Sequence, residues 1–286
     1  MKKIIENKNY DYNEHVQGVD SVFDIKLDKR TKRFLESIKN LKSPKVLEVG
    51  VGQGRYVKKL LNYRPDLKIY GVDISKTAIE GIKKSGPRGS YFVAGAEKLP
   101  FSANFFDVVV IADVLEHLPH PEAAVREIHR VLKVGGIFHF YVPCENEPFT
   151  IDWLFRKANL AKNFTQKHFG HIQYFSHKDI KKIVSKYFRI IKVSYSDHLL
   201  TQILHLVILY LPKMMIDLLG KNNKNIVRDA EDHHSQKSNP LKILKKMWVM
   251  LVSYPASVVG EAETAILKNY PFTAKGLHVT AKKTNQ

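Results

Sequence analysis

Short apolar runs alternate with helical stretches between residues 45 and 142. Each apolar run has the length of a buried strand, and the stretches between them carry apolar residues at helical spacing. This alternation is typical of βαβ units around a parallel sheet. The predicted strands are 45–49, 68–72, 90–93, 106–111 and 136–142, and the main predicted helices are 55–61, 75–84 and 121–132. Gly135 and Gly136 are expected to end the last helix and start the fifth strand.

The pattern continues less regularly after residue 143. We expect an irregular stretch, one helix, a sixth strand and a last strand, over 144–170, 178–186, 188–194 and 276–282. About eighty residues separate the last two strands, and they hold two apolar segments joined by a polar linker, at 199–212, 241–255 and 220–240. Neither apolar segment has the ~18 uncharged residues of a membrane span.

The fold class predicted from this order is α/β. We expect a doubly wound, mostly parallel sheet of seven strands, with a helical insert between the last two strands. The predicted organisation is an N-terminal helical cap, a core, a helical insert or lid, and a final strand with a tail, at 1–40, 41–198, 199–272 and 273–286.

The strongest chemical signal is a glycine-rich turn after the first strand, with Gly50, Gly52 and Gly54. Glycines let the backbone approach a ligand closely, and the following helix N-terminus offers N–H groups to an anion. A dinucleotide fingerprint needs G-x-G-x-x-G. Arg55 or Val57 occupies the third glycine position, so the sequence argues against a nicotinamide enzyme.

Asp73 follows the second predicted strand, 19 residues after Gly54. A carboxylate at this place can accept hydrogen bonds from both hydroxyls of a ribose. The alternative is that Asp73 caps the helix predicted over 75–84.

Four further segments add specificity: Ala96-Glu97-Lys98-Leu99-Pro100-Phe101, Phe106 to Asp113, Leu115-Glu116-His117-Leu118, and Arg130 to Gly136. With the glycine turn, they resemble the class I methyltransferases, specifically the type 11 methyltransferase-domain family, over about residues 40–195 and the final strand. The resemblance implies S-adenosylmethionine as the cofactor. It implies that the turn holds the methionine part, Asp73 the ribose, Ala96 and Glu97 the adenine, and Ala112 and Asp113 the methionine moiety. The complete predicted cofactor set is Glu48, Gly50, Gly52, Gly54, Asp73, Ile74, Ala96, Glu97, Ala112 and Asp113. Gly95 departs from the family, because relatives often carry Asp there against the adenine amine.

The sulfonium donor is already activated, so the main catalytic task is to position the acceptor. A hydroxyl acceptor also needs a base, for which His117, His168 and His171 are available. We take His117 and His171 as the catalytic candidates. Packing, helix capping and ordinary loop positions remain alternatives for all three histidines.

Asp113, Glu116 and His117 lie at i, i+3 and i+4 and could share one face of a turn. Together with His171 they look like the E-x-x-E-H metal motif of small-RNA and ubiquinone-pathway O-methyltransferases, with Asp113 one methylene shorter than glutamate. The same L-E-H-L occurs in metal-free type 11 relatives, and our prediction is a site without metal.

The net charge of +18 is unevenly distributed. Residues 1–150 hold 24 Lys/Arg and 19 Asp/Glu, whereas 151–286 hold 22 and 9. Such a basic half attracts anionic membrane or nucleic acid, or only keeps the protein soluble.

The start of the sequence lacks a hydrophobic signal stretch, so we expect a cytoplasmic protein. The single cysteine, Cys144, is expected to pack in the core.

Residues 199–255 combine apolar helical spacing with Lys242, Lys245, Lys246 and Trp248. We expect them to form a lid that binds the acceptor and touches anionic membrane peripherally. The predicted acceptor is an amphiphilic small molecule, namely a quinone precursor, a lipid or a lipid-linked sugar, methylated at a hydroxyl. An RNA methyltransferase, or a nucleic-acid-binding protein that retains the fold, is the less favoured alternative, since RNA-binding motifs are absent.

Overall fold

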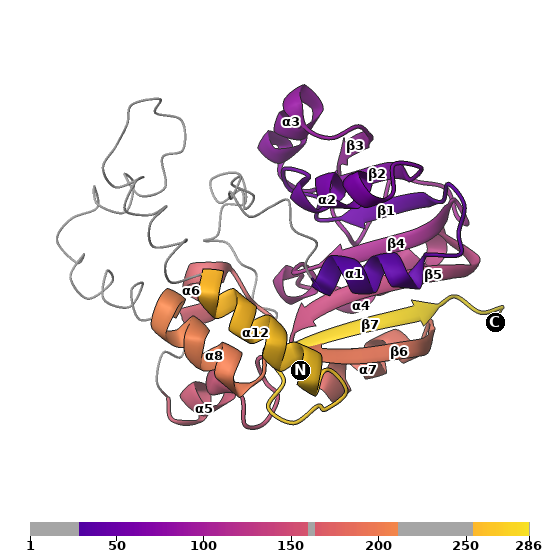
Figure 1. The fold of residues 1–286 in the computed structure, drawn as a ribbon. Coiled ribbons are helices and arrows are strands. Elements are labelled where there is room, and N and C mark those ends of the chain that lie inside the picture. Colours follow the sequence, from indigo (N-terminus) through magenta and orange to yellow (C-terminus); the bar gives the residue numbers. More distant parts are fainter. Residues whose placement is uncertain (1–28, 160–163, 211–253, 286) are drawn as a thin grey trace, which may run out of the picture.

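A computed structural model describes residues 29–159, 164–210 and 254–285 of the chain. Seven strands form one sheet in the order β3-β2-β1-β4-β5-β7-β6 (Figure 1). The first five pair in parallel, and β7 runs antiparallel between β5 and β6. The strands are β1 (Lys45–Val49), β2 (Lys68–Asp73), β3 (Ser90–Val93), β4 (Phe106–Ala112), β5 (Leu132–Pro143), β6 (Arg189–Ser196) and β7 (Gly276–Lys282).

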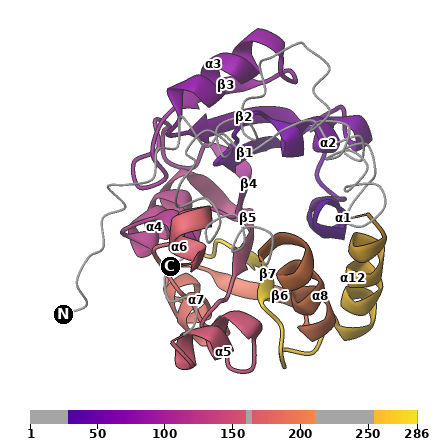
Figure 2. The same ribbon diagram turned by 90° about the vertical axis from the view of Figure 1, so that its left-hand side faces the viewer.

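Helices cover both faces of the sheet (Figure 2). Alternate residues of each buried strand point to opposite faces, so one strand serves two cores. Val46, Val108 and Val110 pack with the apolar sides of α1, α2 and α3, whereas Leu47, Val109 and Ile111 pack with those of α4 and α7. The helices are α1 (Lys29–Ser37), α2 (Arg55–Tyr63), α3 (Lys76–Ser85), α4 (Pro121–Val131) and α7 (His177–Ser185). The predicted doubly wound fold is confirmed.

Two local predictions were wrong. The fifth strand begins at Leu132, before the glycines, because Leu132 pairs with Phe106 and the strand then bulges at Gly135, whose φ is +78°. The stretch predicted as irregular contains two short helices, α5 (Ile151–Lys157) and α6 (Phe164–Phe169). Thr150 caps α5 by accepting a hydrogen bond from the Trp153 N–H. A helix of only seven residues shows little apolar periodicity, so the sequence pattern did not predict it. Cys144 is fully buried, as expected.

The described part of the insert is helical. It comprises α8 (Leu199–His205), one π-helical turn (Leu206–Tyr210) and α12 (Tyr254–Leu267), which lies within the predicted helical insert but was not predicted as a separate helix. Glu263 of α12 joins the two helices, since it accepts hydrogen bonds from the N–H groups of Leu200 and Thr201 at 2.8 and 2.9 Å. The predicted linker and residues 241–253 of the second apolar segment, with Lys242, Lys245, Lys246 and Trp248, lie outside the described residues. Among the described helices, none is long and apolar enough to cross a membrane.

Lys283, just after β7, ties the end of the chain to the core. Its side chain is 8% exposed, and burial lowers its pKa. The ammonium donates to the carbonyls of His129 and Leu132 at 2.7 and 2.8 Å and to Asn104 Oδ1 at 2.9 Å. The lysine thereby satisfies two carbonyls where α4 passes into β5.

Lys283→Met should keep the volume of the side chain but leave those two carbonyls without this donor. We expect it to lower the free energy of unfolding by roughly 2–4 kcal/mol, measured by urea denaturation. Lys282→Met, at the exposed neighbouring position, is the matched control and should change it by no more than about 0.5 kcal/mol. Equal effects of the two substitutions would contradict this role of Lys283.

Candidate functional site

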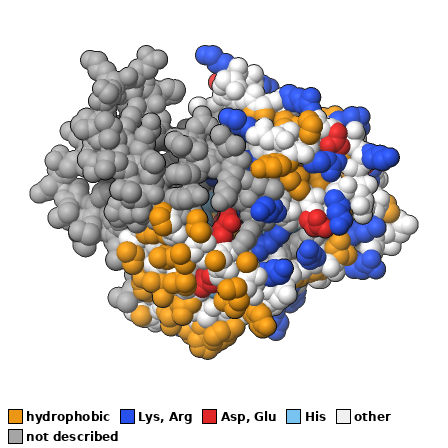
Figure 3. Space-filling view, in the orientation of Figure 1, with side chains coloured by type: hydrophobic (Ala, Val, Ile, Leu, Met, Phe, Trp, Pro, Cys, Tyr) orange, Lys and Arg blue, Asp and Glu red, His pale blue; other side chains and the backbone are white. Residues whose placement is uncertain are grey.

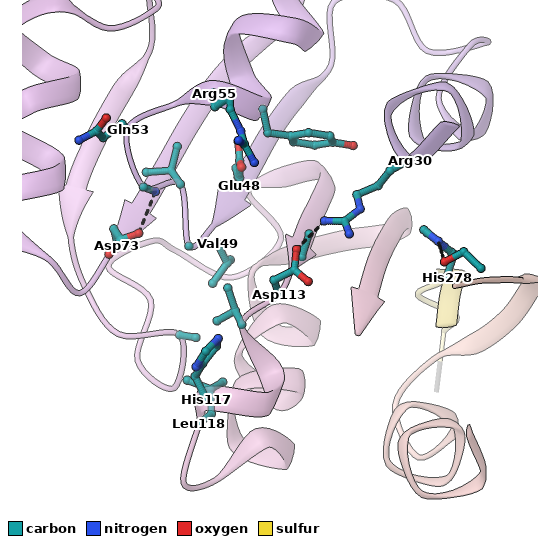
Figure 4. Close-up of a pocket in the computed structure, with 18 of the residues that line it drawn as sticks. Arg30, Glu48, Val49, Gln53, Arg55, Asp73, Asp113, His117, Leu118 and His278 are labelled. Carbon is teal, nitrogen blue, oxygen red and sulfur yellow. Dashed lines mark hydrogen bonds and ion pairs between the residues drawn. The ribbon is translucent and has the colours of Figure 1, made fainter. Parts of the chain in front are cut away.

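A cavity of about 940 Å³ opens at the carboxyl ends of β1, β2 and β4 (Figure 4). This is where open α/β sheets bind their ligands. Its wall on the β1 and β2 side includes Glu48, Gly50, Gly52, Asp73 and Ile74. The opposite wall comes from α1, the insert and the last strands and includes Arg30, Arg33, Asp197, Leu204, Ile208, Ala256 and His278.

The glycine turn after β1 has a backbone that only glycine adopts easily. Gly50, Gly52 and Gly54 have φ values of +79°, +51° and +77°. A Cβ on Gly50 would lie 2.3 Å from Val114 Cγ2, and one on Gly54 would lie 2.4 Å from Ile82 Cδ1. The turn is therefore fixed both by backbone conformation and by close packing. Gly54 contributes through this packing, because it is not among the residues that line the cavity.

The Asp73 carboxylate connects the glycine turn to the turn between β2 and α3. Its Oδ2 accepts from the Gly52 N–H at 2.8 Å, and its Oδ1 accepts from the Ser75 N–H at 2.9 Å. The N-cap of α3 is Ser75, whose hydroxyl accepts from the Ala78 N–H, so the alternative role of Asp73 as the cap is wrong. Each carboxylate oxygen retains a second lone pair for a ligand in the cavity.

Glu48 lies in the floor of the cavity, 8% exposed. Burial, and next the charge of Asp73, raises the pKa of its carboxyl well above the usual value. Its Oε2 has no hydrogen-bond partner among the described residues. A buried oxygen in this state costs free energy until a ligand or a water donates to it.

The other predicted cofactor residues line the same cavity. Ile74 presents an apolar side chain that is 63% exposed, and Ala96 is buried. The Glu97 carboxylate accepts from the His120 N–H at 2.9 Å. A Cβ on Gly95 would meet no heavy atom within 4 Å, so the departure from the family leaves open space at this point of the wall.

Asp113 does not join the cluster of Glu116, His117 and His171, although its spacing resembles that of a metal motif. It has a φ of +54° directly after β4, and its carboxylate pairs with the guanidinium of Arg30 at 2.5 Å. Arg30 also stacks on the ring of Tyr141, with its Cζ 3.8 Å from the centroid. Neither partner was predicted, because α1 is far from β4 in sequence and nothing local in the KRTKRFLES segment marks Arg30 as facing the site.

His117 and His171 meet in a buried cluster behind the cavity wall. Their rings lie 4.9 Å apart between centroids, and His117 reaches the cavity, whereas His171 is not among its lining residues. His117 Nδ1 lies 3.1 Å from the Gly170 carbonyl, and His171 Nδ1 lies 2.8 Å from Glu145 Oε1. The side chain of His168 lies outside the described residues.

Burial and charge set the protonation of this cluster. Burial, and next His171, lowers the pKa of His117 to about 4. Burial also lowers the pKa of His171, but Glu145 outweighs it, so the net shift is upward. Burial raises the pKa of Glu116 to about 8, and both of its carboxyl oxygens lack a hydrogen-bond partner among the described residues. Glu145, beside Lys275 and His171, has a pKa of about 2 despite its burial.

The same cluster has the composition of a metal site. Among the described residues, Glu116, His117 and His171 can each offer one ligand atom, and these atoms lie within 4.8 Å of one another. A carboxylate with two imidazoles suits a divalent transition-metal ion or zinc. Burial keeps Glu116 protonated at neutral pH, so an ion would have to displace that proton.

Comparison with known proteins connects this site to a family. Residues 47–140 match the family model described as a methyltransferase domain. The chain is 28% identical over 136 residues to a demethylmenaquinone methyltransferase of Chlorobaculum tepidum, covering 47% of this chain and 54% of that protein. It is 32% identical over 97 residues to a ubiquinone/menaquinone biosynthesis C-methyltransferase of Burkholderia orbicola, covering 32% and 40%.

Among solved structures, the cyclase SpnF superposes with a TM-score of 0.53 at 17% identity, over 89% of this chain and 80% of that one. The chain spans about half the length of the curated relatives it matches. The predicted resemblance to the methyltransferase-domain family is confirmed over residues 47–140, and S-adenosylmethionine is the cofactor that this match supports.

We predict that the cluster works without a metal ion. Methyl transfer should then be unchanged by a chelator such as EDTA, and Mn²⁺ should bind no more tightly to the wild-type chain than to a Glu116→Gln variant. Loss of turnover in chelator, with recovery on addition of a divalent ion, would contradict this prediction. It would assign Glu116, His117 and His171 as the ligands.

Proposed function

We propose that this chain is an S-adenosylmethionine-dependent methyltransferase that modifies a hydroxyl of an amphiphilic small molecule. The acceptor classes we favour are a quinone precursor, a lipid or a lipid-linked sugar. The observation that carries the proposal is one cavity that combines the glycine turn, the Asp73 carboxylate and the unpartnered oxygen of Glu48.

The residues on the β1 and β2 side fit the donor. Asp73 can accept from ribose hydroxyls, and Ile74 offers an apolar surface to the flat adenine ring. The orphaned Glu48 oxygen suits an ammonium group or a water that it binds. When bound, S-adenosylmethionine supplies an activated methyl group on a sulfonium, and the protein's task is to hold the acceptor in line with it.

The opposite wall supports an acceptor with an apolar part. Leu204, Ile208 and Ala256 of the insert line it. The outer side of the same helices is also apolar, and Figure 3 shows hydrophobic side chains gathered there. The exposed ones on α8, the following π-helical turn and α12 are Leu199, Leu200, Ile203, Val207, Val258, Val259 and Ile266. Such a surface beside the cavity supports peripheral contact with a membrane that holds the acceptor. The names of the two relatives make quinone precursors the first acceptors to test.

Incubation of the purified chain with labelled donor and with separate lipid, RNA and soluble extracts tests the acceptor class. We expect label in the lipid extract, on an alkali-stable ether oxygen. Label on a carbon atom of the acceptor would support methyltransferase activity but contradict a hydroxyl as the methylated group. Label in RNA, with binding that weakens steeply with salt, would establish the alternative.

Asp73→Ala should remove one or two charge-assisted hydrogen bonds to the ribose. Each is worth ~1.5–3 kcal/mol, so affinity for S-adenosylhomocysteine should fall about tenfold to a hundredfold if one bond is lost, and up to about 10⁴-fold if two are lost. Calorimetry on the full chain measures this loss, and NAD should not bind to either protein. Asp73→Asn, which keeps one acceptor oxygen, separates the ligand effect from collapse of the turn. Glu80→Ala, on the exposed side of α3, is the charge-matched control. Unchanged affinity in Asp73→Ala would remove this residue from the donor site.

His117 is our candidate for the base that takes the acceptor's proton, with His171 behind it. A base must be neutral to act, and with a pKa of about 4 His117 is neutral throughout the neutral range. Turnover under saturating donor should therefore be flat from about pH 6 to 8 and should fall only as the pH approaches 4. An inflection near pH 6.5 that disappears in His117→Gln would show an ordinary histidine pKa instead.

A further inference from the structure

Two arginines of α1, Arg30 and Arg33, lie one turn apart and both line the cavity. Their states differ. Arg30 is neutralised by Asp113 and covered by Tyr141. Arg33 makes no hydrogen bond and no ion pair within the described part of the chain, and burial and the charge of Arg30 lower its pKa in spite of Asp197. A half-buried guanidinium without a partner is costly, because lost hydration is not replaced.

Asp197 is the carboxylate that acts most strongly on Arg33 through its charge, and one of its two oxygens is already hydrogen-bonded elsewhere. Asp197 Oδ2 accepts from the Tyr141 hydroxyl at 2.9 Å and from the Ser196 hydroxyl at 3.0 Å. Both bonds hold the Asp197 side chain towards β5 and β6. Arg33 and Asp197 both line the cavity, and Asp197 makes no hydrogen bond to Arg33 within the described part of the chain.

A second unpartnered polar atom lies on the same side of the cavity. His278 is 4% exposed, and its Nε2 lies 3.0 Å from Ser196 Oγ. The single Ser196 hydrogen goes to Asp197, so His278 Nε2 must be the donor in this pair and Nδ1 must carry the lone pair. That Nδ1 has no hydrogen-bond partner among the described residues. It can accept from an O–H, such as that of a protonated phosphate or a hydroxyl next to an anionic group.

Arg33 and His278 lie away from the donor wall. The charges that act on Arg33 belong to Asp197, Arg30, Tyr141 and Glu261, which come from the β6 end, α1, β5 and α12. Glu48 and Asp73 belong to β1 and β2, and two strands, β4 and β5, separate β1 from β7 in the sheet. The carboxylate of the donor's methionine part, expected at the glycine turn, is thus not the natural partner of Arg33.

We propose that the acceptor carries an anionic group, a carboxylate or a phosphate, which Arg33 binds while the apolar part of the acceptor lies against Leu204, Ile208 and Ala256. A guanidinium fork matches both anions through two parallel N–H···O bonds. This inference rests on the proposed function in one respect, namely that the anionic ligand is the methyl acceptor. The anion site itself follows from Arg33 and His278 alone.

The test compares three probes with the same twelve-carbon alkyl chain: dodecyl phosphate, tridecanoate and the uncharged dodecyl maltoside. Calorimetry on the full chain, with and without S-adenosylhomocysteine, should show the anionic probes binding more tightly than the maltoside. The tighter of the two anions identifies the group. Arg33→Gln should weaken the anionic probes about tenfold or more and leave the maltoside unchanged. Arg33→Lys keeps the charge but loses the forked guanidinium, so its affinity for the anionic probes should lie between those of the wild type and Arg33→Gln.

Arg189→Gln is the matched control, because Arg189 is exposed at the amino end of β6, the end away from the cavity. It should leave all three probes unchanged. The proposal is overturned if Arg33→Gln binds the anionic probes like the wild type, if the three probes bind alike, or if Arg33→Gln loses S-adenosylhomocysteine instead. Failure of the wild type to bind S-adenosylhomocysteine would defeat the proposed function, while the alkyl probes would still decide the anion site.

Discussion

The carboxylate of Asp73 joins the two turns on which the donor side of the cavity depends. Its oxygens accept from Gly52 after β1 and from Ser75 before α3. Parallel strands bring these two turns together, but backbone pairing ends with the strands, at Val49 and Val72 in this pair. Beyond that point, the Gly50 and Val51 N–H groups reach the Val72 carbonyl and Asp73 completes the connection. The glycines allow the loop its left-handed backbone, and the aspartate selects this one conformation from the many that glycine permits.

Sequence patterns predicted the sheet well because its strands obey a local rule. The central strands β1 and β4 are buried on both faces and read as continuous apolar runs. Six of the seven predicted strands agree with the structure to within two residues at each end. The exception, at Gly135, depends on a bulge against β4 that no local pattern encodes. Except for Gly54, the predicted donor-side residues line one cavity for a related reason: they lie at or after strand ends, and parallel strands end at one edge.

The parts of the site that sequence reasoning missed depend on contacts between distant segments. Arg30 reaches Asp113 across 83 positions, and Glu145 reaches His171 across 26. An arginine or a glutamate in a charged segment has the same local signature whether it faces water or a cavity. Spacing also misplaced Asp113, because its φ of +54° breaks the helical geometry on which the i, i+3, i+4 argument relied.

The basic second half of the chain uses part of its charge internally. Lys283 is buried among carbonyls, and Lys275 lies 2.8 Å from Asp152 and 3.6 Å from Glu145, with a side chain 14% exposed. Lys275 is therefore balanced locally by two carboxylates, and neither ammonium is exposed for direct contact with a membrane or a nucleic acid. Lys275 acts instead on the buried histidine cluster behind the cavity wall. Its charge keeps Glu145 ionised, and Glu145 in turn orients His171 through a hydrogen bond. A count of charges along the sequence thus does not show which cations can contact an outside polyanion, and cations placed inside, such as Arg33 at the cavity wall, tell more about the ligand than the total does.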